Sequence, residues 1–392
     1  MRVTAAAERA LRGGHPWVFA DSVRDANRPG QLGELAVIFD REDRFLAIGL
    51  HDPDSPLAVR VLHTGKPVQL DDAWWRNRWL QTRQARKGLF DEGTTGYRCI
   101  YGESDGFPGL VLDRYGETFV LKLYTAAWLP RLESVMAHLI EVFRPGSVVL
   151  RLSRNIQELV QQKFGHCDGQ LLFGALARNP VIFLESGLRF EADVVRGQKT
   201  GFFLDQRDSR IFFSSASRDQ EILNAFSYSG AFSVYAFGGG AKEIISIDSS
   251  RPALELAEQN LALNGFAEAR GELLKGDAFV YLKETDRKFD LIVLDPPSLA
   301  HKRSDVMAAT GGYKFLNLHA LNHLKPGGML LTFSCSQHLS TDLFQKVVFG
   351  AAVDATRKVS IVKRLGHPID HPISLHHPEG EYLKGLVLRV LD

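Results

Sequence analysis

The feature that most constrains the fold is an alternation of short apolar segments with helical ones in the second half of the chain. From about residue 181, the segments EILNAF, EIISID, FDLIVLDPP and GGMLLTFSCS read as buried strands, and RPALELAEQNLALNG and GGYKFLNLHALNHL read as helices between them. This alternation predicts a mostly parallel sheet with helices on both faces. Such sheets bind ligands beyond the carboxyl ends of their strands, so residues at those ends are candidate site residues.

The first half of the chain reads differently. To about Leu70 it consists of short strand-like runs separated by Asp, Pro and Gly turns. DDAWWRNRWLQTRQARKGLF then reads as a helix with aspartates at its start and Gly88 at its end. The sequence then predicts a small α+β unit, with two strand-like runs in GLVLDRYGETFVLKLY, a helix near WLPRLESVMAHLIEVF and the strand SVVLRLS. We therefore expect three domains, over residues 1–71, 72–178 and 179–392.

Composition limits the classes of protein that remain. The 392 residues carry a formal net charge of +1, so any surface that binds nucleic acid must be a local basic patch. No apolar run approaches the roughly 20 residues that span a bilayer, and the first residues lack the apolar core of a signal peptide. We expect a cytoplasmic protein with no membrane contact. Cys99, Cys167 and Cys335 are too few and too scattered for a disulfide framework or a structural metal site.

Polar residues follow the first three predicted strands of the second half. Gly230, in NAFSYSG, allows the backbone to approach a ligand closely, although the same segment is also a common strand-to-helix turn. Asp248 can accept both hydroxyls of a ribose, or it caps the next helix unless Ser250 does so. Asp277 can accept a hydrogen bond from an exocyclic amine, with a turn aspartate as the alternative. The absence of GxGxxG argues against a dinucleotide.

The fourth strand and the strand after it carry the most informative residues. Asp295 is followed by Pro296 and Pro297, which stiffen the chain and hold the carboxylate still. Cys335 ends the next strand between two serines. Free cysteines are more often inert buried side chains, which is our interpretation of Cys99. The position of Cys335 at the mouth of the sheet favours a functional thiol instead.

At this point the motifs resemble a known family. The chain resembles class I S-adenosylmethionine-dependent methyltransferases in four features: the acid at the end of the second strand, the Asn264–Gly265 pair, the DPP strand and the LKPGG turn. The resemblance narrows to the RlmI-type bacterial enzymes that make 5-methylcytosine in 23S ribosomal RNA, on the motifs GESDGFPGLVLDRYG, GQKTGFFLDQRDSR, LDPPS, SCS and HPEGEYLKGLVLRV. The segment RGGHPWVF corresponds to the entry motif of a PUA domain.

The resemblance implies an α/β fold in three parts. These are an N-terminal β-barrel PUA domain that binds RNA, a small α+β domain and a C-terminal Rossmann-like class I methyltransferase domain. It further implies S-adenosylmethionine as methyl donor, S-adenosylhomocysteine as product, 23S ribosomal RNA as partner and no metal. The sequence leaves a homodimer open.

The resemblance also assigns site residues. The implied cofactor-binding residues are Lys199, Thr200, Gly201, Phe202, Phe203, Phe226, Tyr228, Ser229, Gly230, Asp248, Ser249, Asp277, Ala278 and Asp295. One position departs from the family, because Asn224 stands where the first strand usually carries an acid. Asparagine can still hydrogen-bond the methionine amine, without the charge.

The expected chemistry gives Cys335 and Asp295 catalytic roles. A thiolate that adds to C6 of cytosine makes C5 nucleophilic, and this covalent route needs a cysteine facing the cofactor. Asp295 is expected to contact N3. Related enzymes use a second cysteine in the fourth-strand motif to assist release, whereas DPPS contains none, so release must proceed by another route.

Candidate RNA contacts are His301, Lys302, Arg303 and Arg207. In the Trp74–Lys87 segment, we interpret Trp75 and Trp79 as packing residues and leave the arginines open. HPIDHPISLHHPEG is rich in histidine, but its prolines and its lack of ligand spacing favour a rigid loop over a metal site.

Three alternatives remain. Methylation of an exocyclic amine would need an aromatic residue in place of Ser298, and uracil C5 methyltransferases carry Cys-Asn-Pro where this chain has Cys335-Ser336-Gln337. A non-catalytic RNA-binding assembly factor that holds the cofactor would not need the intact Asp295 and Cys335.

Overall fold

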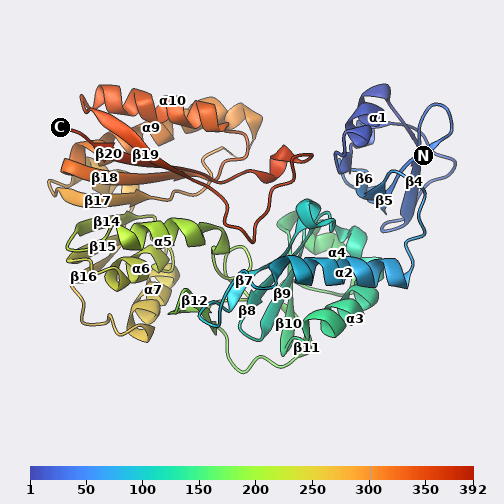
Figure 1. Cartoon of the computed structure of the whole chain (residues 1–392), viewed down its shortest axis with the longest axis horizontal. Helices are drawn as coiled ribbons and strands as arrows, with labels where there is room; N and C mark the ends of the chain where they lie inside the picture. Colours follow the sequence, from blue (N-terminus) through green and yellow to red (C-terminus); the bar gives the residue numbers. More distant parts are fainter. Residues whose placement is uncertain (301) are drawn as a thin grey trace. The chain divides into compact units, whose positions relative to one another are not determined.

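The computed structural model describes residues 1–300 and 302–392, which form two compact units (Figure 1). The first unit comprises Met1–Leu184, Ala192–Leu204 and Ile369–Gly380. The second comprises Glu185–Glu191, Asp205–Pro368 and Glu381–Asp392. No helix of the described residues is long and apolar enough to cross a membrane.

The first unit begins with a six-stranded sheet in the order β2-β6-β5-β4-β1-β3. Its strands are β1 (Arg2–Val3), β2 (Trp17–Val18), β3 (Val23–Asp25), β4 (Leu35–Phe39), β5 (Phe45–His51) and β6 (Val59–Thr64). The helix α1 (Ala5–Arg12) starts where the Thr4 hydroxyl accepts a hydrogen bond from the Ala7 backbone N–H at 3.3 Å. Leu11 of this helix packs with Val18 and Ile38 in a small core.

A second sheet of the first unit contains five strands in the order β11-β10-β9-β8-β7. The strands are β7 (Gly96–Tyr101), β8 (Leu110–Tyr115), β9 (Thr118–Leu123), β10 (Ser147–Leu152) and β11 (Gln170–Gly174), with helices α2 (Asp72–Arg86), α3 (Leu132–Phe143) and α4 (Gln157–Phe164). Asp71 caps α2 by accepting from the Trp74 N–H at 2.9 Å. Trp75 and Trp79 are buried in the core, which confirms their interpretation as packing residues.

The second unit is built on a seven-stranded sheet in the order β16-β15-β14-β17-β18-β20-β19. The strands are β14 (Glu221–Ala225), β15 (Glu243–Asp248), β16 (Gly271–Lys275), β17 (Phe289–Leu294), β18 (Leu324–Ser334), β19 (Val359–Leu365) and β20 (Lys384–Val390). All neighbours pair in parallel except β20, which is antiparallel to both β18 and β19. The predicted mostly parallel sheet is confirmed.

Helices cover both faces of this sheet: α5, α6 and α7 lie on one side, and α9 and α10 lie on the other (Figure 1). The helices are α5 (Arg207–Ser215), α6 (Ala231–Gly238), α7 (Arg251–Leu263), α8 (Ala278–Glu284), α9 (Val306–His323) and α10 (Thr341–Asp354). The strand order runs one way from β14 through β15 to β16 and the other way from β14 to β17. In open α/β sheets, ligands bind where the strand order reverses, which here is at the carboxyl ends of β14 and β17. A hairpin of β12 (Val181–Glu185) and β13 (Leu188–Ala192) completes the strands.

Candidate active site

The loop after β14 is tightly held. Phe226, Tyr228 and Gly230 have backbone φ angles of 63°, 45° and 71°, a left-handed region that non-glycine residues rarely adopt. The Tyr228 N–H donates to one carboxylate oxygen of Asp248 at 2.8 Å, and the Ser250 N–H donates to the other at 2.8 Å. Asp248 therefore fixes the loop, while the cap of α7 is the Ser250 hydroxyl, which accepts from Ala253.

Gly230 brings this loop against α7. A Cβ atom at Gly230 would lie 2.7 Å from the Ala257 Cβ atom, closer than real Cβ atoms approach. The Asn260 side chain of the same helix donates to the Ser229 carbonyl at 2.8 Å. The backbone at the end of β14 is thus rigid and has room only for glycine at position 230.

Two buried polar atoms beside this loop fit a polar ligand. The Asn224 side-chain nitrogen donates to the Ser233 hydroxyl at 2.8 Å. Among the described residues, neither the Asn224 side-chain oxygen nor the Ser227 hydroxyl has a hydrogen-bond partner, although both are buried. Because buried polar atoms are nearly always paired, this amide oxygen, an acceptor, and this hydroxyl, a donor or acceptor, fit the polar groups of S-adenosylmethionine.

Asp277 has a local role in the structure. Its carboxylate accepts from the Phe279 N–H at 2.7 Å and caps α8, whose first residue is the buried Ala278. The Phe226 and Phe279 rings lie 5.9 Å apart, so the loop after β14 meets the first turn of α8. Ser249 is exposed. The roles of these residues toward the cofactor remain predictions.

The ends of β17 and β18 bring Cys335 to the DPP segment. The two strands pair in parallel up to Leu294 and Thr332. Beyond them, the Cys335 sulfur lies 3.9 Å from the Pro296 carbonyl oxygen, and the Asp295 N–H contacts the Ala225 carbonyl at 3.5 Å. The structure thus places the predicted nucleophile beside the predicted rigid turn, at the sheet edge next to β14.

A hydroxyl network that sequence reasoning did not anticipate fixes this arrangement. The Ser336 hydroxyl lies 3.1 Å from the Ser298 hydroxyl and 2.9 Å from that of Tyr313, and the Ser334 hydroxyl donates to Tyr313 at 3.0 Å. The Ala300 N–H also donates to Ser336, at 3.2 Å. Burial raises the pKa of Tyr313, which keeps its hydroxyl protonated.

The three cysteines have different surroundings. Cys99 is fully buried, and desolvation raises the pKa of its thiol further, so it is inert. Cys167 is exposed in the first unit. Cys335 is half-buried at the mouth of the sheet, the exposure that a nucleophile needs.

The Lys199–Phe203 segment belongs to the first unit. Its Thr200 hydroxyl donates to a carboxylate oxygen of Asp113 at 2.6 Å and lies 2.8 Å from the Tyr115 hydroxyl. The Lys122 ammonium donates to the Lys199 carbonyl at 2.9 Å. These contacts shape the segment, while its assignment to the cofactor site remains a prediction.

The predicted RNA contacts differ in exposure. Lys302 and Arg303 are exposed, and His301 lies outside the described residues. Arg207 is only 2% exposed, and its guanidinium lies 3.4 Å from Glu185, which also pairs with Arg210. Its role toward RNA remains a prediction.

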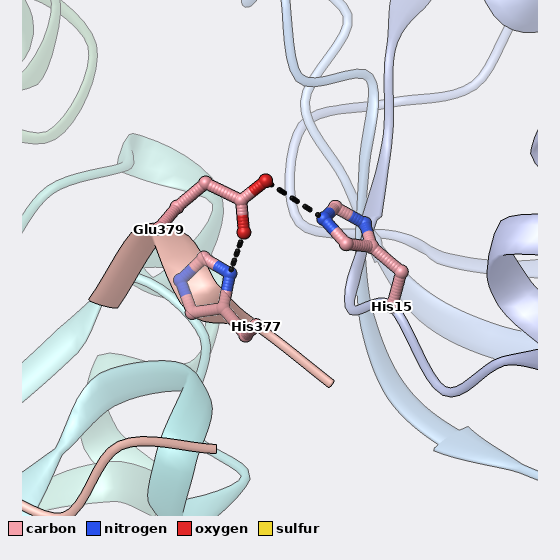
Figure 2. A group of neighbouring side chains, drawn as sticks. All are labelled: His15, His377 and Glu379. Carbon is pink, nitrogen blue, oxygen red and sulfur yellow. Dashed lines mark hydrogen bonds and ion pairs between the residues drawn. The ribbon is translucent and has the colours of Figure 1, made fainter. Parts of the chain in front are cut away.

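A group of two histidines and a glutamate in the first unit has the composition of a metal site (Figure 2). The Glu379 carboxylate lies 3.4 Å from His15 Nε2 and 3.1 Å from His377 Nδ1. The Trp17 N–H donates to His15 Nδ1 at 3.3 Å. Because that nitrogen accepts, a neutral His15 carries its proton on Nε2 and donates it to Glu379, whereas a metal ligand would need Nε2 free. The geometry therefore supports a clasp rather than a metal site, defined here as His15, His377 and Glu379, in which Glu379 bonds His15 and lies within ion-pair distance of His377.

Two family models match the chain. An S-adenosylmethionine-dependent methyltransferase model matches residues 165–389, and a PUA-like domain model matches residues 1–64. Together with the seven-stranded sheet, these matches confirm the predicted fold class.

The chain also resembles named relatives along nearly its whole length. A ribosomal RNA large subunit methyltransferase from Deinococcus radiodurans is 48% identical over 398 residues, covering 100% of this chain and 97% of the relative. A ribosomal RNA large subunit methyltransferase I from Shewanella denitrificans is 39% identical and covers 98% of this chain and 97% of its own. A solved methyltransferase from Streptococcus mutans has a TM-score of 0.84 at 23% identity, covering 100% and 99% of the two chains. Another similar structure, with a TM-score of 0.86, is a methyltransferase complexed with S-adenosylhomocysteine.

Proposed function

Because the chain belongs to the S-adenosylmethionine-dependent methyltransferase family, in the group of the ribosomal RNA large subunit methyltransferases, we propose that it methylates C5 of a cytosine in 23S ribosomal RNA. The observation that carries the proposal is the half-buried thiol of Cys335, 3.9 Å from the Pro296 carbonyl oxygen of the DPP turn. Methyl transfer to an exocyclic amine needs no thiol at this place.

Cys335 supplies the nucleophile in the proposed reaction. After the thiol loses its proton, the sulfur bonds to C6 of cytosine, and the electrons of the C5=C6 bond shift to C5. S-adenosylmethionine supplies an electrophilic methyl group on its sulfonium, which C5 takes up. Loss of the C5 proton to a base then restores the double bond, breaks the C6–S bond and returns the cysteine.

Asp295 and the hydroxyl network support the attack of the thiolate on the base. Asp295 holds the cytosine, and the hydroxyl network holds Cys335. Asp295 is anchored between Ala225 and the buried Pro296, which suits a contact to N3, where negative charge develops. Ser336 ties the residue after Cys335 to Ser298 and Tyr313. A nucleophile held in this way loses little freedom when the base arrives.

RNA binding is proposed for two parts of the first unit. The PUA-like domain over residues 1–64 is the first. The second is a hollow beside α2, here called the α2 hollow, which is lined by basic, aromatic and neutral polar side chains and one leucine, with no acid among them. Its lining residues are Asn77, Leu80, Gln81, Arg83, Gln84, Arg86, Lys87, Tyr97, Arg114, Phe119 and Phe143. Basic groups beside aromatic rings suit phosphates and unpaired bases.

The test is release of tritium from RNA. The protein is given 23S ribosomal RNA that lacks the modification and is tritiated at cytosine C5, together with S-adenosylmethionine. We expect tritium release to water that depends on the cofactor and is lost in Cys335→Ala. The variant Cys167→Ala, an exposed cysteine of the first unit, is the matched control and should retain release.

Other outcomes identify the alternatives. Methyl incorporation without tritium release would refute the C5 assignment and indicate another atom or base. Neither signal on free RNA or on ribosomal subunits would indicate a non-catalytic RNA-binding protein.

A further inference from the structure

Lys384 is a buried lysine next to the proposed nucleophile in the sheet. It is the first residue of β20, and its register partner on β18 is Ser334, the residue before Cys335. Lys384 is only 5% exposed. Lysine is rarely buried unless its charge has a partner.

The Lys384 ammonium group holds the loop that starts at Cys335. It donates to the Ser336 carbonyl and to the Leu339 carbonyl, each at 2.8 Å. These carbonyls lie between the end of β18 and the start of α10, so one side chain fixes both ends of the turn. The contact anchors the backbone on the carboxyl side of the nucleophile.

The charge of this ammonium is not balanced locally. Among residues 1–300 and 302–392, no carboxylate forms an ion pair with Lys384. Desolvation lowers the pKa of Lys384, while the charges of Glu381 and Cys335 act in the opposite direction. Glu381 is exposed, so solvent screens its charge. Tyr313 also interacts with Cys335 and stays neutral, and Asp295 lies at the same turn as a second carboxylate.

We propose that Lys384 is a positioning residue that fixes the turn after Cys335 and stabilises its thiolate with a buried positive charge. The inference rests on the proposed function in taking Cys335 as the nucleophile. It supplies what that chemistry needs, because a free thiol is only a few per cent thiolate at neutral pH and a nearby cation favours the ionised form.

The test is the pH dependence of alkylation at Cys335 in the full-length protein. Iodoacetamide reacts with thiolates, and peptide mass spectrometry resolves each cysteine. Cys167 is an internal reference in every sample, because it is exposed and lies in the other unit. In the wild type we expect the midpoint for Cys335 to lie below that for Cys167; equal midpoints would overturn the proposal without any variant.

Variants separate charge from structure. In Lys384→Met we expect the midpoint to rise by about one pH unit, so that alkylation at pH 7 falls about tenfold while the plateau rate at high pH persists. A loss of loop structure alone would change the plateau and leave the midpoint in place, which would contradict the charge role. If Lys384→Met does not fold, Lys384→Arg should keep the midpoint and Lys384→Gln should raise it.

The matched control is Lys346→Met. Lys346 is an exposed lysine of α10 that pairs with Asp342 at 2.7 Å, and its replacement should leave the midpoint unchanged. The alkylation assay uses neither RNA nor cofactor. A shifted midpoint together with methylation by Cys335→Ala would therefore refute the proposed function and leave the electrostatic effect established.

Discussion

The Tyr313 hydroxyl bonds the hydroxyls of Ser334 and Ser336, which flank the proposed nucleophile, so removing it breaks two hydrogen bonds at once. Tyr313→Phe keeps the buried ring but removes the acceptor of the Ser334 hydroxyl and one of the partners of the Ser336 hydroxyl. We expect destabilisation by about 1–2 kcal/mol and a fall in methyl transfer of roughly tenfold. Chemical denaturation and the tritium assay measure the two effects.

The control for that variant is Tyr281→Phe. Tyr281 is half-buried on α8, and no hydrogen bond of its hydroxyl occurs among the described residues. Full activity in Tyr313→Phe would show that the network does not position Cys335.

The steric requirement for glycine at position 230 can also be tested with a single substitution. Gly230→Ala places a Cβ atom 2.7 Å from Ala257 at a φ of 71°. We expect destabilisation by about 1–3 kcal/mol and weaker binding of S-adenosylmethionine, measured by calorimetry. Gly238→Ala is the control, because its Cβ would meet Leu188 at an ordinary 3.7 Å. Unchanged affinity in Gly230→Ala would remove this loop from the cofactor site.

At the residue scale, sequence reasoning located side chains that end strands and missed those that act across them. Asp295 and Cys335 were predictable because each directly follows an apolar run. Tyr313 lies inside a helix, where its hydroxyl gives no signal in the pattern. Lys384 lies at the start of a strand in the motif HPEGEYLKGLVLRV. A lysine that opens an otherwise apolar run was the signal in the sequence that could have identified it.

At the scale of single elements, α2 divides its arginines between structure and surface. Arg86 pairs with Asp105 through both terminal nitrogens and is buried, so it is structural. Arg83 is exposed and lines the α2 hollow. Arg83→Glu should weaken binding to 23S ribosomal RNA about tenfold and lower the slope of log affinity against log salt by about 1.

The matched control is Arg76→Glu on the same helix. Arg76 pairs with Glu141 at 2.6 Å and does not line the hollow. Equal losses in the two variants, measured by filter binding over a salt series, would mean that only the overall charge matters.

Element boundaries were less predictable than element types. The sequence predicts a helix from residue 311, but α9 begins at Val306, because burial of Ala309 and Tyr313 overrides the low helix propensity of the two glycines between them. The helix α1 was not predicted, although Thr4 before three alanines is a recognisable start signal.

At the scale of the whole molecule, the clasp of His15, His377 and Glu379 makes stability depend on pH. Desolvation lowers the pKa of His377 from 6.5, so the unfolded chain binds its proton more readily. Stability is therefore full above about pH 6.5 and falls as the pH drops below it. Burial raises the pKa of Glu379, but hydrogen bonds from its own backbone and from His15, together with the charges of both histidines, lower this pKa below its usual 4.5. The folded protein therefore loses further stability as the pH falls below that value.

We expect the difference in unfolding free energy between pH 7.5 and pH 5.5 to shrink in His377→Gln. The measurement is urea denaturation of both proteins at each pH. His376→Gln, an exposed histidine of the same segment, is the control and should keep the wild-type difference. An unchanged difference in His377→Gln would mean that other groups set the pH dependence.

The position of β20 in its sheet has a consequence for biosynthesis. It is the last strand of the chain, yet it lies between β18 and β19 rather than at an edge. Proteins emerge from the ribosome N-terminus first, so until residues 384–390 appear, β18 and β19 have no strand to join them and the turn after Cys335 lacks its anchoring lysine. A nascent chain thus holds the whole loop after β14 before the turn after the proposed nucleophile is anchored, so we expect any activity that depends on this turn only after residues 384–390 have been made.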